Sequence, residues 1–368
     1  MNPMRWDGQR TDALTEVAEP ILPGMPLLPG FVRSVRTPEF QGVTFHEVHA
    51  KTALNRVPGG SAMPFSWTVN PYRGCTHACG YCFARNTHTY LDFDAGKDFD
   101  NEIVVKTNVA EVLRSELAKP RWQREHVALG TNTDPYQRAE GRYRLMPGII
   151  DALAGSGTPF SILTKGTVLG RDLDQLTAAS EKVPVGIGIS LALLDPGLQA
   201  SLEPGTPSPK ARLGLISRVR DAGLPCGVFM APLLPQLTDS TEQITELLTA
   251  LVEAGATGVS GIPLHLRPGA KEWFMSWLAR ERPELVAVYQ RLYGTGAYLP
   301  RDYRDQVAER IKAARIATGV KGFDSAMRGR GSGSSVPGDP DAVFPVGSLP
   351  PARRPPPPAS GAEQLRLI

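Results

Sequence analysis

The sequence has few cysteines, little net charge and no long hydrophobic run. Four of its 368 residues are cysteines, aromatic residues make up 7%, and the formal net charge is +3. So small a charge gives little support for general binding to nucleic acid. No apolar run approaches the length of a membrane-spanning helix, and residues 1–15 lack the apolar core of a signal peptide. We therefore expect a cytoplasmic protein that does not associate with a membrane.

Three of the four cysteines lie close together. Cys75, Cys79 and Cys82 have the spacing C-x3-C-x2-C, a density that indicates a bound group rather than ordinary packing. So short a loop supplies three thiolates but not a closed cage of four ligands. A [4Fe-4S] cluster held by three thiolates leaves one iron open for a small molecule. A ligand that binds through an amine and a carboxylate at once would suit that iron. The head group of methionine carries both groups.

Two other interpretations of these cysteines stay open. A structural zinc site has four ligands, and His77 would have to be the fourth. A cluster of redox-active thiols would need no metal.

Strand and helix patterns alternate through the middle of the chain. Apolar runs predict six core strands, at residues 65–70, 127–130, 160–164, 185–191, 227–231 and 258–264. Helical patterns lie between them, at residues 108–118, 145–154, 173–181, 208–222 and 240–254. This alternation indicates a parallel sheet with crossover helices. Periodicity alone does not separate a partial barrel from a doubly wound sheet.

The two ends of the chain differ from its middle in composition. We expect a poorly ordered N-terminal arm, a core barrel, a helical extension and a disordered tail rich in Pro, Gly and Arg. Their ranges are 1–42, 43–267, 268–327 and 328–368, respectively. Within the extension, helical patterns cover residues 270–280, 283–293 and 301–318. The tail cannot bury a core of its own.

The cysteine motif, with Tyr81 directly before its last cysteine, resembles the signature of radical S-adenosyl-L-methionine (SAM) enzymes. The segments WTVNPYRGC, TNTDPYQ, EPGTPSP and MAPLLPQLTD resemble the spore-photolyase-like branch, also described as DNA repair photolyase-like. This resemblance covers residues 43–303. It implies an α/β fold with a partial TIM barrel, the (β/α)6 radical SAM core. It also implies a [4Fe-4S] cluster on the three cysteines, bound SAM, and a reductant such as flavodoxin or ferredoxin.

The resemblance further suggests residues for the methionine amino group of SAM. Radical SAM enzymes carry a motif for this group where the second core strand ends, and Thr131, Asn132 and Asp134 occupy that place here. The residues at this place differ from the family's usual Gly-Gly-Glu motif. Asp134 followed by proline also fits an Asp-Pro turn with a capping Asn.

Other strand ends carry candidates for the rest of SAM. In spore photolyase a lysine and a serine at comparable strand ends serve the methionine carboxylate, which assigns this role here to Lys165 and Ser190. A solvated lysine is the alternative for Lys165. The fifth strand lacks the family's usual glycine and glutamate, so adenine would contact main chain there, with Tyr81 as packing partner.

The resemblance implies reductive cleavage of SAM to a 5′-deoxyadenosyl radical that abstracts hydrogen from an unidentified substrate. Residues 136–144 are basic and interleaved with aromatics, a composition suited to nucleic acid but equally typical of a solvated loop. Spore photolyase has a hydrogen-donating cysteine near the second strand end, whereas residues 130–134 contain none and Cys226 fits a buried strand. We therefore do not expect thymine-dimer repair by the same route.

Two hypotheses from other functional classes remain. An iron-sulfur redox sensor or electron carrier would have no SAM chemistry. A zinc-stabilised nucleic-acid-binding protein would need His77 as a metal ligand.

Overall fold

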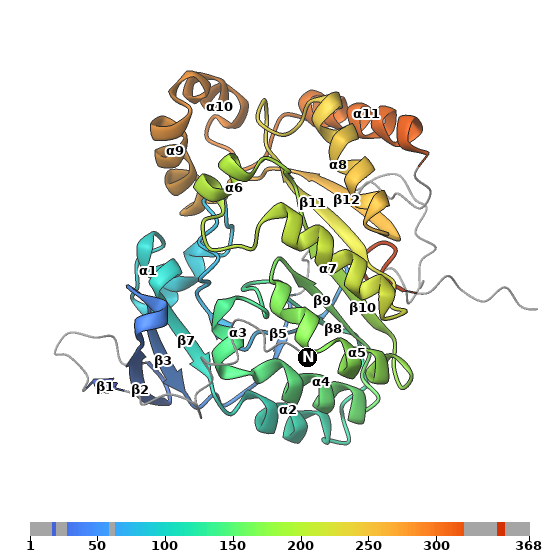
Figure 1. The fold of residues 1–368 in the computed structure, drawn as a ribbon. Coiled ribbons are helices and arrows are strands. Elements are labelled where there is room, and N and C mark those ends of the chain that lie inside the picture. The colour runs from blue at the N-terminus through green and yellow to red at the C-terminus, as the bar shows by residue number, and fades with distance from the viewer. Residues whose placement is uncertain (1–16, 20–27, 59–62, 320–343, 350–368) are drawn as a thin grey trace, which may run out of the picture.

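A computed structural model describes residues 17–19, 28–58, 63–319 and 344–349 of the chain (Figure 1). Its larger sheet has seven strands, in the order β12-β11-β10-β9-β8-β5-β4. Six neighbouring strands are parallel: β5 (Trp67–Val69), β8 (Val127–Leu129), β9 (Phe160–Thr164), β10 (Val185–Ser190), β11 (Gly227–Leu233) and β12 (Gly258–Pro263). The edge strand β4 (Leu54–Arg56) is antiparallel to β5. These six strands confirm the predicted (β/α)6 partial barrel.

Helices connect the parallel strands and cover the outside of the sheet. They are α2 (Val109–Leu117), α3 (Arg138–Tyr143), α4 (Leu145–Gly155), α5 (Leu173–Ser180), α6 (Pro196–Leu202), α7 (Pro209–Asp221) and α8 (Thr241–Glu253), with a 3-10 turn η4 (Thr167–Arg171) before α5. All residues of β8 and β10 are buried, as is typical of parallel strands covered on both faces. This double burial is why continuous apolar runs marked these strands in the sequence.

The predicted helices beyond residue 268 are present. They are α9 (Ala270–Glu281), η5 (Pro283–Leu285), α10 (Val286–Tyr293) and α11 (Arg301–Thr318). The last of them, α11, packs against α8 and β12 and so completes the sixth strand-helix unit (Figure 1). Helices α9 and α10 instead cover a second apolar cluster that includes Cys79 and Tyr81.

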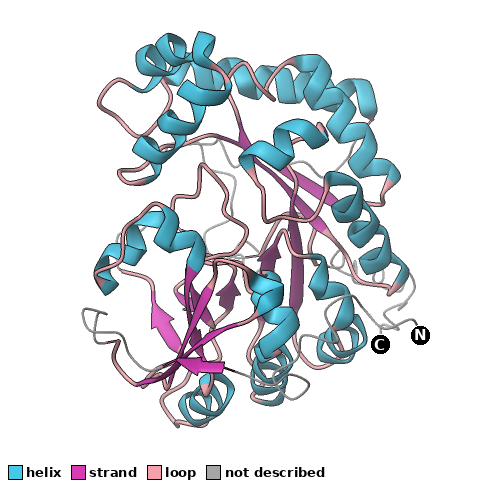
Figure 2. Cartoon of the chain, turned by 60° about the vertical axis from the view of Figure 1, so that its left-hand side comes forward, coloured by secondary structure: helices cyan, strands magenta, loops and turns pink. Residues whose placement is uncertain are grey.

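A smaller five-stranded sheet lies beside the barrel, in the order β1-β2-β3-β7-β6 (Figure 2). Its strands are β1 (Val17–Glu19), β2 (Phe31–Arg36), β3 (Thr44–Val48), β6 (Tyr72–Arg73) and β7 (Glu102–Lys106). A 3-10 turn η2 (Pro38–Phe40) joins β2 to β3, and η3 (Arg85–Leu91) and α1 (Lys97–Asn101) precede β7. Because β6 directly precedes Gly74, this sheet anchors the start of the cysteine loop.

The structure differs from the expected N-terminal arm. Strand β2 pairs with β3, and Val35 and Phe40 are buried in a cluster with Phe45 and Tyr72. These partners come from other segments of the chain, so local composition could not reveal them. The other residues of the arm, 1–16 and 20–27, lie outside the described residues.

The structure also differs from the expected disordered tail at residues 344–349, which pack against the amino ends of the barrel strands. The rest of the predicted tail, 328–343 and 350–368, lies outside the described residues. Among the described residues, no helix has both the length and the apolar character needed to cross a bilayer.

Candidate active site

The three cysteines lie on one loop at the carboxyl end of β5. Cys75 and Cys79 are each 7% exposed, Cys82 is half-buried, and none of them forms a disulfide bond. The Cys75 amide donates to the carbonyl of Phe99 at 2.9 Å, and the Cys82 amide donates to the carbonyl of Cys79 at 3.2 Å. The loop therefore brings three free thiols to the end of the barrel where functional groups gather.

Gln137, from the loop after β8, holds the start of the cysteine loop. Its side-chain oxygen accepts from the Thr76 amide at 2.8 Å, and its side-chain nitrogen donates to the Gly74 carbonyl at 3.1 Å. Gln137 is fully buried, so these contacts replace water for backbone groups that would otherwise be unpaired. The sequence analysis did not single out Gln137, although it lies in the quoted segment TNTDPYQ.

Arg85 holds the middle of the loop. Its guanidinium donates to the Cys79 carbonyl at 3.0 Å and to the Asp100 carboxylate at 2.9 Å. It is fully buried and lies over the rings of Phe99 and Trp273, at 5.3 Å and 4.8 Å from their centroids. Its planar, multidentate head group fits this crowded site better than a lysine would.

The segment after α6 clamps the other side of the loop. The Gly80 amide donates to the Leu202 carbonyl at 2.8 Å, and the Gly205 amide donates to the His77 carbonyl at 3.1 Å. A Cβ on Gly205 would lie 1.9 Å from the Thr76 carbonyl oxygen, so only glycine fits at position 205. The segment EPGTPSP thus contributes a backbone contact as well as side chains.

The donor set fits an iron-sulfur cluster better than a single metal ion. Among the described residues, no group of three or more His, Cys, Asp and Glu side chains is arranged to hold one ion. In a cubane cluster each thiolate binds a different iron, so the three sulfurs need not converge on one point. Burial raises the pKa of the Cys82 thiol to about 11 and also raises the pKa of Cys79, so these thiols lose their protons when metal binds.

Asp134 is bound by its own protein rather than open to a ligand. Its carboxylate accepts from the Thr164 hydroxyl at 2.5 Å, from the Lys165 amide at 2.6 Å and from the Tyr136 amide at 2.8 Å. It also lies 3.3 Å from His77 Nδ1. The contact with Tyr136 shows a capped turn in which Asp134, rather than the expected asparagine, is the capping residue. Binding of the SAM amino group by Asp134 stays a prediction, as it does for the half-buried residues Thr131 and Asn132.

The pairing with Asp134 also bears on the zinc hypothesis. Burial alone would lower the pKa of His77, yet the Asp134 carboxylate beside it raises that pKa to about 10. The ion pair also holds His77 Nδ1 against the Asp134 carboxylate, at 3.3 Å. His77 therefore serves the loop as a partner of Asp134, which does not favour a Cys3His zinc site.

The structure brings Lys165 and Ser190 together at the carboxyl ends of β9 and β10. The Lys165 ammonium donates to the Ser190 hydroxyl at 2.7 Å and lies 3.3 Å from the Glu203 carboxylate. Only 13% of the Lys165 side chain is exposed, so the alternative of a solvated lysine is wrong. Arg212, from α7, donates to Glu203 at 2.7 Å and to the Ser190 carbonyl at 3.1 Å.

Tyr81 connects this polar network to the cysteine loop. Its hydroxyl donates to Glu203, and Lys165 lies 5.6 Å from its ring centroid. We call Tyr81, Lys165, Ser190, Glu203 and Arg212 the polar network. Its charge also reaches the loop, because Glu203 raises the pKa of Cys79 and Lys165 lowers it. Packing of adenine on Tyr81 stays a prediction.

The polar network carries a surplus of positive charge. Burial by itself would raise the pKa of Glu203, but the adjacent cations Lys165 and Arg212 hold it well below its ordinary value. Glu203 is therefore ionised, and two cations surround one carboxylate. A second carboxylate would balance the remaining charge. The Ser190 hydroxyl donates to the Ala231 carbonyl at 3.1 Å, so it would have to turn away from that carbonyl to donate to such a carboxylate. The sequence analysis quoted the segment containing Glu203 but assigned no role to Glu203 or Arg212.

The basic segment of residues 136–144 does not form an open nucleic-acid surface. Tyr136 is fully buried and Arg142 is 1% exposed. Arg138 lies over the ring of Phe40, 5.1 Å from its centroid. The segment instead packs between the barrel and the smaller sheet, a position that the sequence could not show. Cys226 is fully buried in the barrel core, as predicted, and burial raises its pKa to about 12.

An exposed aromatic patch lies directly after the last cysteine. Phe83 is 39% exposed, and its ring centroid lies 5.8 Å from that of His265. Tyr298, 61% exposed, also stacks on His265, and their ring centroids are 5.9 Å apart. The guanidinium of Arg267 lies 5.6 Å from the Phe83 ring centroid. We call these four residues the aromatic patch.

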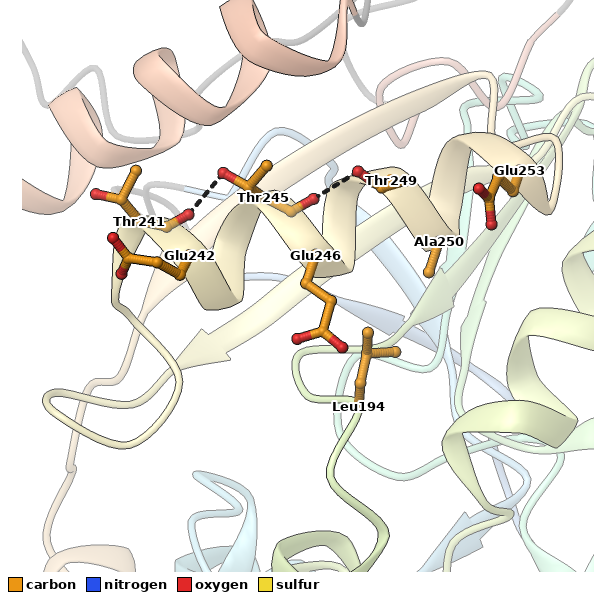
Figure 3. A pocket seen from close by; sticks show the side chains of 8 residues that line it. All are labelled: Leu194, Thr241, Glu242, Thr245, Glu246, Thr249, Ala250 and Glu253. Carbon is orange, nitrogen blue, oxygen red and sulfur yellow. Dashed lines mark hydrogen bonds between the residues drawn. The ribbon is translucent and has the colours of Figure 1, made fainter.

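A hollow of about 630 Å³ lies elsewhere, along α8 (Figure 3). Its lining includes Glu242, Glu246 and Glu253 but no residue of the cysteine loop or the polar network. Thr245 and Thr249 donate to backbone carbonyls one turn earlier, at 2.7 and 2.9 Å. This hollow is therefore an acidic helix face open to solvent.

Comparison with known proteins identifies the family. The radical SAM superfamily profile matches residues 69–248. The protein Rv2578c of Mycobacterium tuberculosis, described as uncharacterized, is 59% identical over 309 residues, which cover 84% of this chain and 91% of that protein. This chain belongs to the radical SAM superfamily. It is therefore an enzyme of that superfamily, and the predicted family and chemistry class are confirmed.

More distant similarities extend to other sources. An uncharacterized protein of Acidianus two-tailed virus, ORF301, is 28% identical over 227 residues, which cover 60% of this chain and 74% of that protein. Among solved structures, spore photoproduct lyase complexed with dinucleoside spore photoproduct has a TM-score of 0.58 at 15% sequence identity. The structural match covers 76% of this chain and 81% of the lyase chain. At this identity the likeness shows a shared fold.

Proposed function

We propose that Cys75, Cys79 and Cys82 hold a [4Fe-4S] cluster and that Lys165 and Ser190 bind the carboxylate of SAM beside it. The observation that carries this proposal is the polar network, which joins Tyr81 of the cysteine loop to a buried site with one unbalanced positive charge. With both cofactors bound, reductive cleavage of SAM supplies a 5′-deoxyadenosyl radical that abstracts hydrogen from the substrate.

The chain's own residues would prepare this site in three ways. Glu203 and Arg212 hold Lys165 at the end of β9, so that its ammonium needs no rearrangement to meet a carboxylate. Gln137 and Arg85 fix the backbone of the cysteine loop. Thr131, Asn132 and Asp134 stay candidates for the amino group, with Asp134 contributing through the backbone turn that it caps.

A nucleic acid, or a molecule derived from one, is the substrate class that we propose. Spore photoproduct lyase, which shares the fold, was solved with a dinucleoside photoproduct. In this chain the aromatic patch beside Cys82 offers exposed rings for stacking and one guanidinium for a phosphate. Burial and the neighbouring Arg267 lower the pKa of His265, so its ring is neutral and suited to stacking.

A one-electron reductant such as flavodoxin or ferredoxin would complete the system, and we propose that the protein is cytoplasmic. The low potential that this chemistry needs suits a reducing compartment, where thiols remain available as cluster ligands.

The deciding experiment is anaerobic reconstitution with iron and sulfide, followed by reduction with dithionite and addition of SAM. We expect a SAM-dependent change in the cluster's electron paramagnetic resonance signal together with formation of 5′-deoxyadenosine. Cys82→Ala should lose both, whereas Cys226→Ala, a buried cysteine far from the site, should keep both. A reducible cluster that ignores SAM would support the redox-carrier hypothesis, and zinc without iron would refute both.

A further inference from the structure

Residues 344–349, with the sequence FPVGSL, lie at the amino ends of β10, β11 and β12. We call them the C-terminal segment. Lys165 and Ser190 lie at the carboxyl ends of β9 and β10, so the C-terminal segment contacts the opposite end of the barrel from the candidate active site.

The barrel strands leave room for this segment. Gly188, Gly227 and Gly258 are register partners in β10, β11 and β12, so they form one row across three neighbouring strands. Gly186 is two residues before Gly188 and therefore faces the same side. Barrel interiors are ordinarily filled by bulky branched side chains, and a row of glycines leaves that space empty. Glycine within a strand often marks the close approach of another backbone.

The C-terminal segment fills this space at contact distance. A Cβ on Gly227 would lie 2.5 Å from the Val346 carbonyl oxygen, and a Cβ on Gly258 would lie 2.6 Å from the same atom. A Cβ on Gly186 would lie 2.6 Å from Cδ1 of Phe344. Real Cβ atoms do not come so close to other atoms, so even alanine at these positions would displace the segment.

The segment is held by specific contacts as well as by shape. The Ser348 amide donates to the Pro345 carbonyl at 2.9 Å, which closes a turn with Gly347 at a φ of 73°. Thr257 donates its hydroxyl to the Gly347 carbonyl at 2.6 Å. The ring of Phe344 meets that of His126 edge-on at 4.5 Å.

We propose that the amino end of the barrel is a peptide-binding site, and that its occupant is the chain's own C-terminal segment. The row of glycines is the binding surface, the turn at Gly347 is the recognised shape, and Phe344 is the apolar anchor. Tethering to the same chain gives the segment a high effective concentration, so the site stays filled without a partner. A filled site also keeps water from entering the barrel at the end opposite the cofactors.

The test uses the full-length chain and a fluorescein-labelled peptide with the sequence of residues 341–351. Gly347→Val should release the C-terminal segment, since a branched side chain disfavours this φ and its Cβ would lie 2.4 Å from the Gly258 amide nitrogen. Fluorescence anisotropy should then show saturable binding of the peptide to the variant. Binding to the unmodified protein should be at least tenfold weaker, because its site is already filled.

Two controls test whether binding depends on the turn in the peptide and on the row of glycines in the protein. The same peptide carrying Gly347→Val should not bind the variant protein. A protein with both Gly347→Val and Gly258→Val, in which the site itself is obstructed, should not bind the unmodified peptide. Equal binding to the variant and the unmodified protein would overturn the proposal, and so would an absence of binding to a variant whose circular dichroism matches that of the unmodified protein.

Discussion

Replacing Glu203 with glutamine would test whether the polar network is ionised as the structure indicates. Glu203 and Arg212 are both fully buried, and Lys165 lies 3.3 Å from the same carboxylate. Glu203→Gln keeps the shape of the side chain but removes its charge, which leaves two cations facing a neutral amide. Removing one partner of a buried ion pair costs about 3–5 kcal/mol.

The pH dependence of this loss has a definite sign. The folded-state pKa of Glu203 is depressed, so its ionised form stabilises the fold at every pH above the unfolded value of about 4.3. This contribution is lost only as the pH falls below that value toward the folded-state pKa. The difference in unfolding free energy between the unmodified protein and Glu203→Gln should therefore stay constant from pH 8 to pH 5.

The assay is urea unfolding of the apo protein, followed by circular dichroism across this pH range. Glu246→Gln is the matched control, because Glu246 is exposed on α8 and its replacement should change stability by no more than about 0.5 kcal/mol. The reasoning would be refuted if Glu203→Gln were as stable as this control. It would also be refuted if the deficit grew between pH 8 and pH 5, because the folded-state pKa of Glu203 would then be raised by burial rather than depressed by its cationic neighbours.

Two further substitutions test the cofactor assignments. Lys165→Met should weaken SAM binding to the reconstituted protein by roughly tenfold to a hundredfold, which is the contribution of one charged hydrogen bond. Titration calorimetry measures this affinity, and an unchanged affinity would show that Lys165 does not bind SAM. Gly205→Ala should lower the iron bound after reconstitution, because its Cβ would lie 1.9 Å from the Thr76 carbonyl oxygen. Gly214→Ala on α7, where a Cβ has no neighbour within 4 Å, should bind as much iron as the unmodified protein. If both variants bound the same amount of iron, the cysteine loop would be able to shift and accommodate the added methyl group.

The barrel was predictable because the burial of its strands is visible in their amino-acid sequence. Parallel strands covered on both faces are continuously apolar, and each of the six predicted runs matches a strand of the sheet. The smaller sheet was only partly predictable. Strand β3 pairs with β7, which begins at Glu102, and β6 has two residues, so neither the pairing nor β6 has a local signature.

The candidate site divides in the same way. Cysteine spacing pointed to the loop, and the positions of Lys165 and Ser190 at strand ends predicted that these two side chains meet, because a parallel sheet brings its carboxyl ends together. Glu203 and Arg212 could not be recognised as members of the network, since Glu203 follows directly after α6 and Arg212 lies in α7, outside the strands. The position of the basic segment, residues 136–144, could not be predicted from its composition. Its composition suggested an exposed surface, whereas Tyr136 and Arg142 are buried between two sheets.

By itself, the sequence determined the spacing of the three thiols in the cysteine loop and the order of strands and helices, because both depend on residue type and position within short stretches. Tertiary structure alone decided which charges meet. It placed Glu203 between Lys165 and Arg212, paired His77 with Asp134, and seated residues 344–349 on a row of glycines in three strands. Such contacts join segments that are distant in the chain, and only the packed fold brings them within bonding distance.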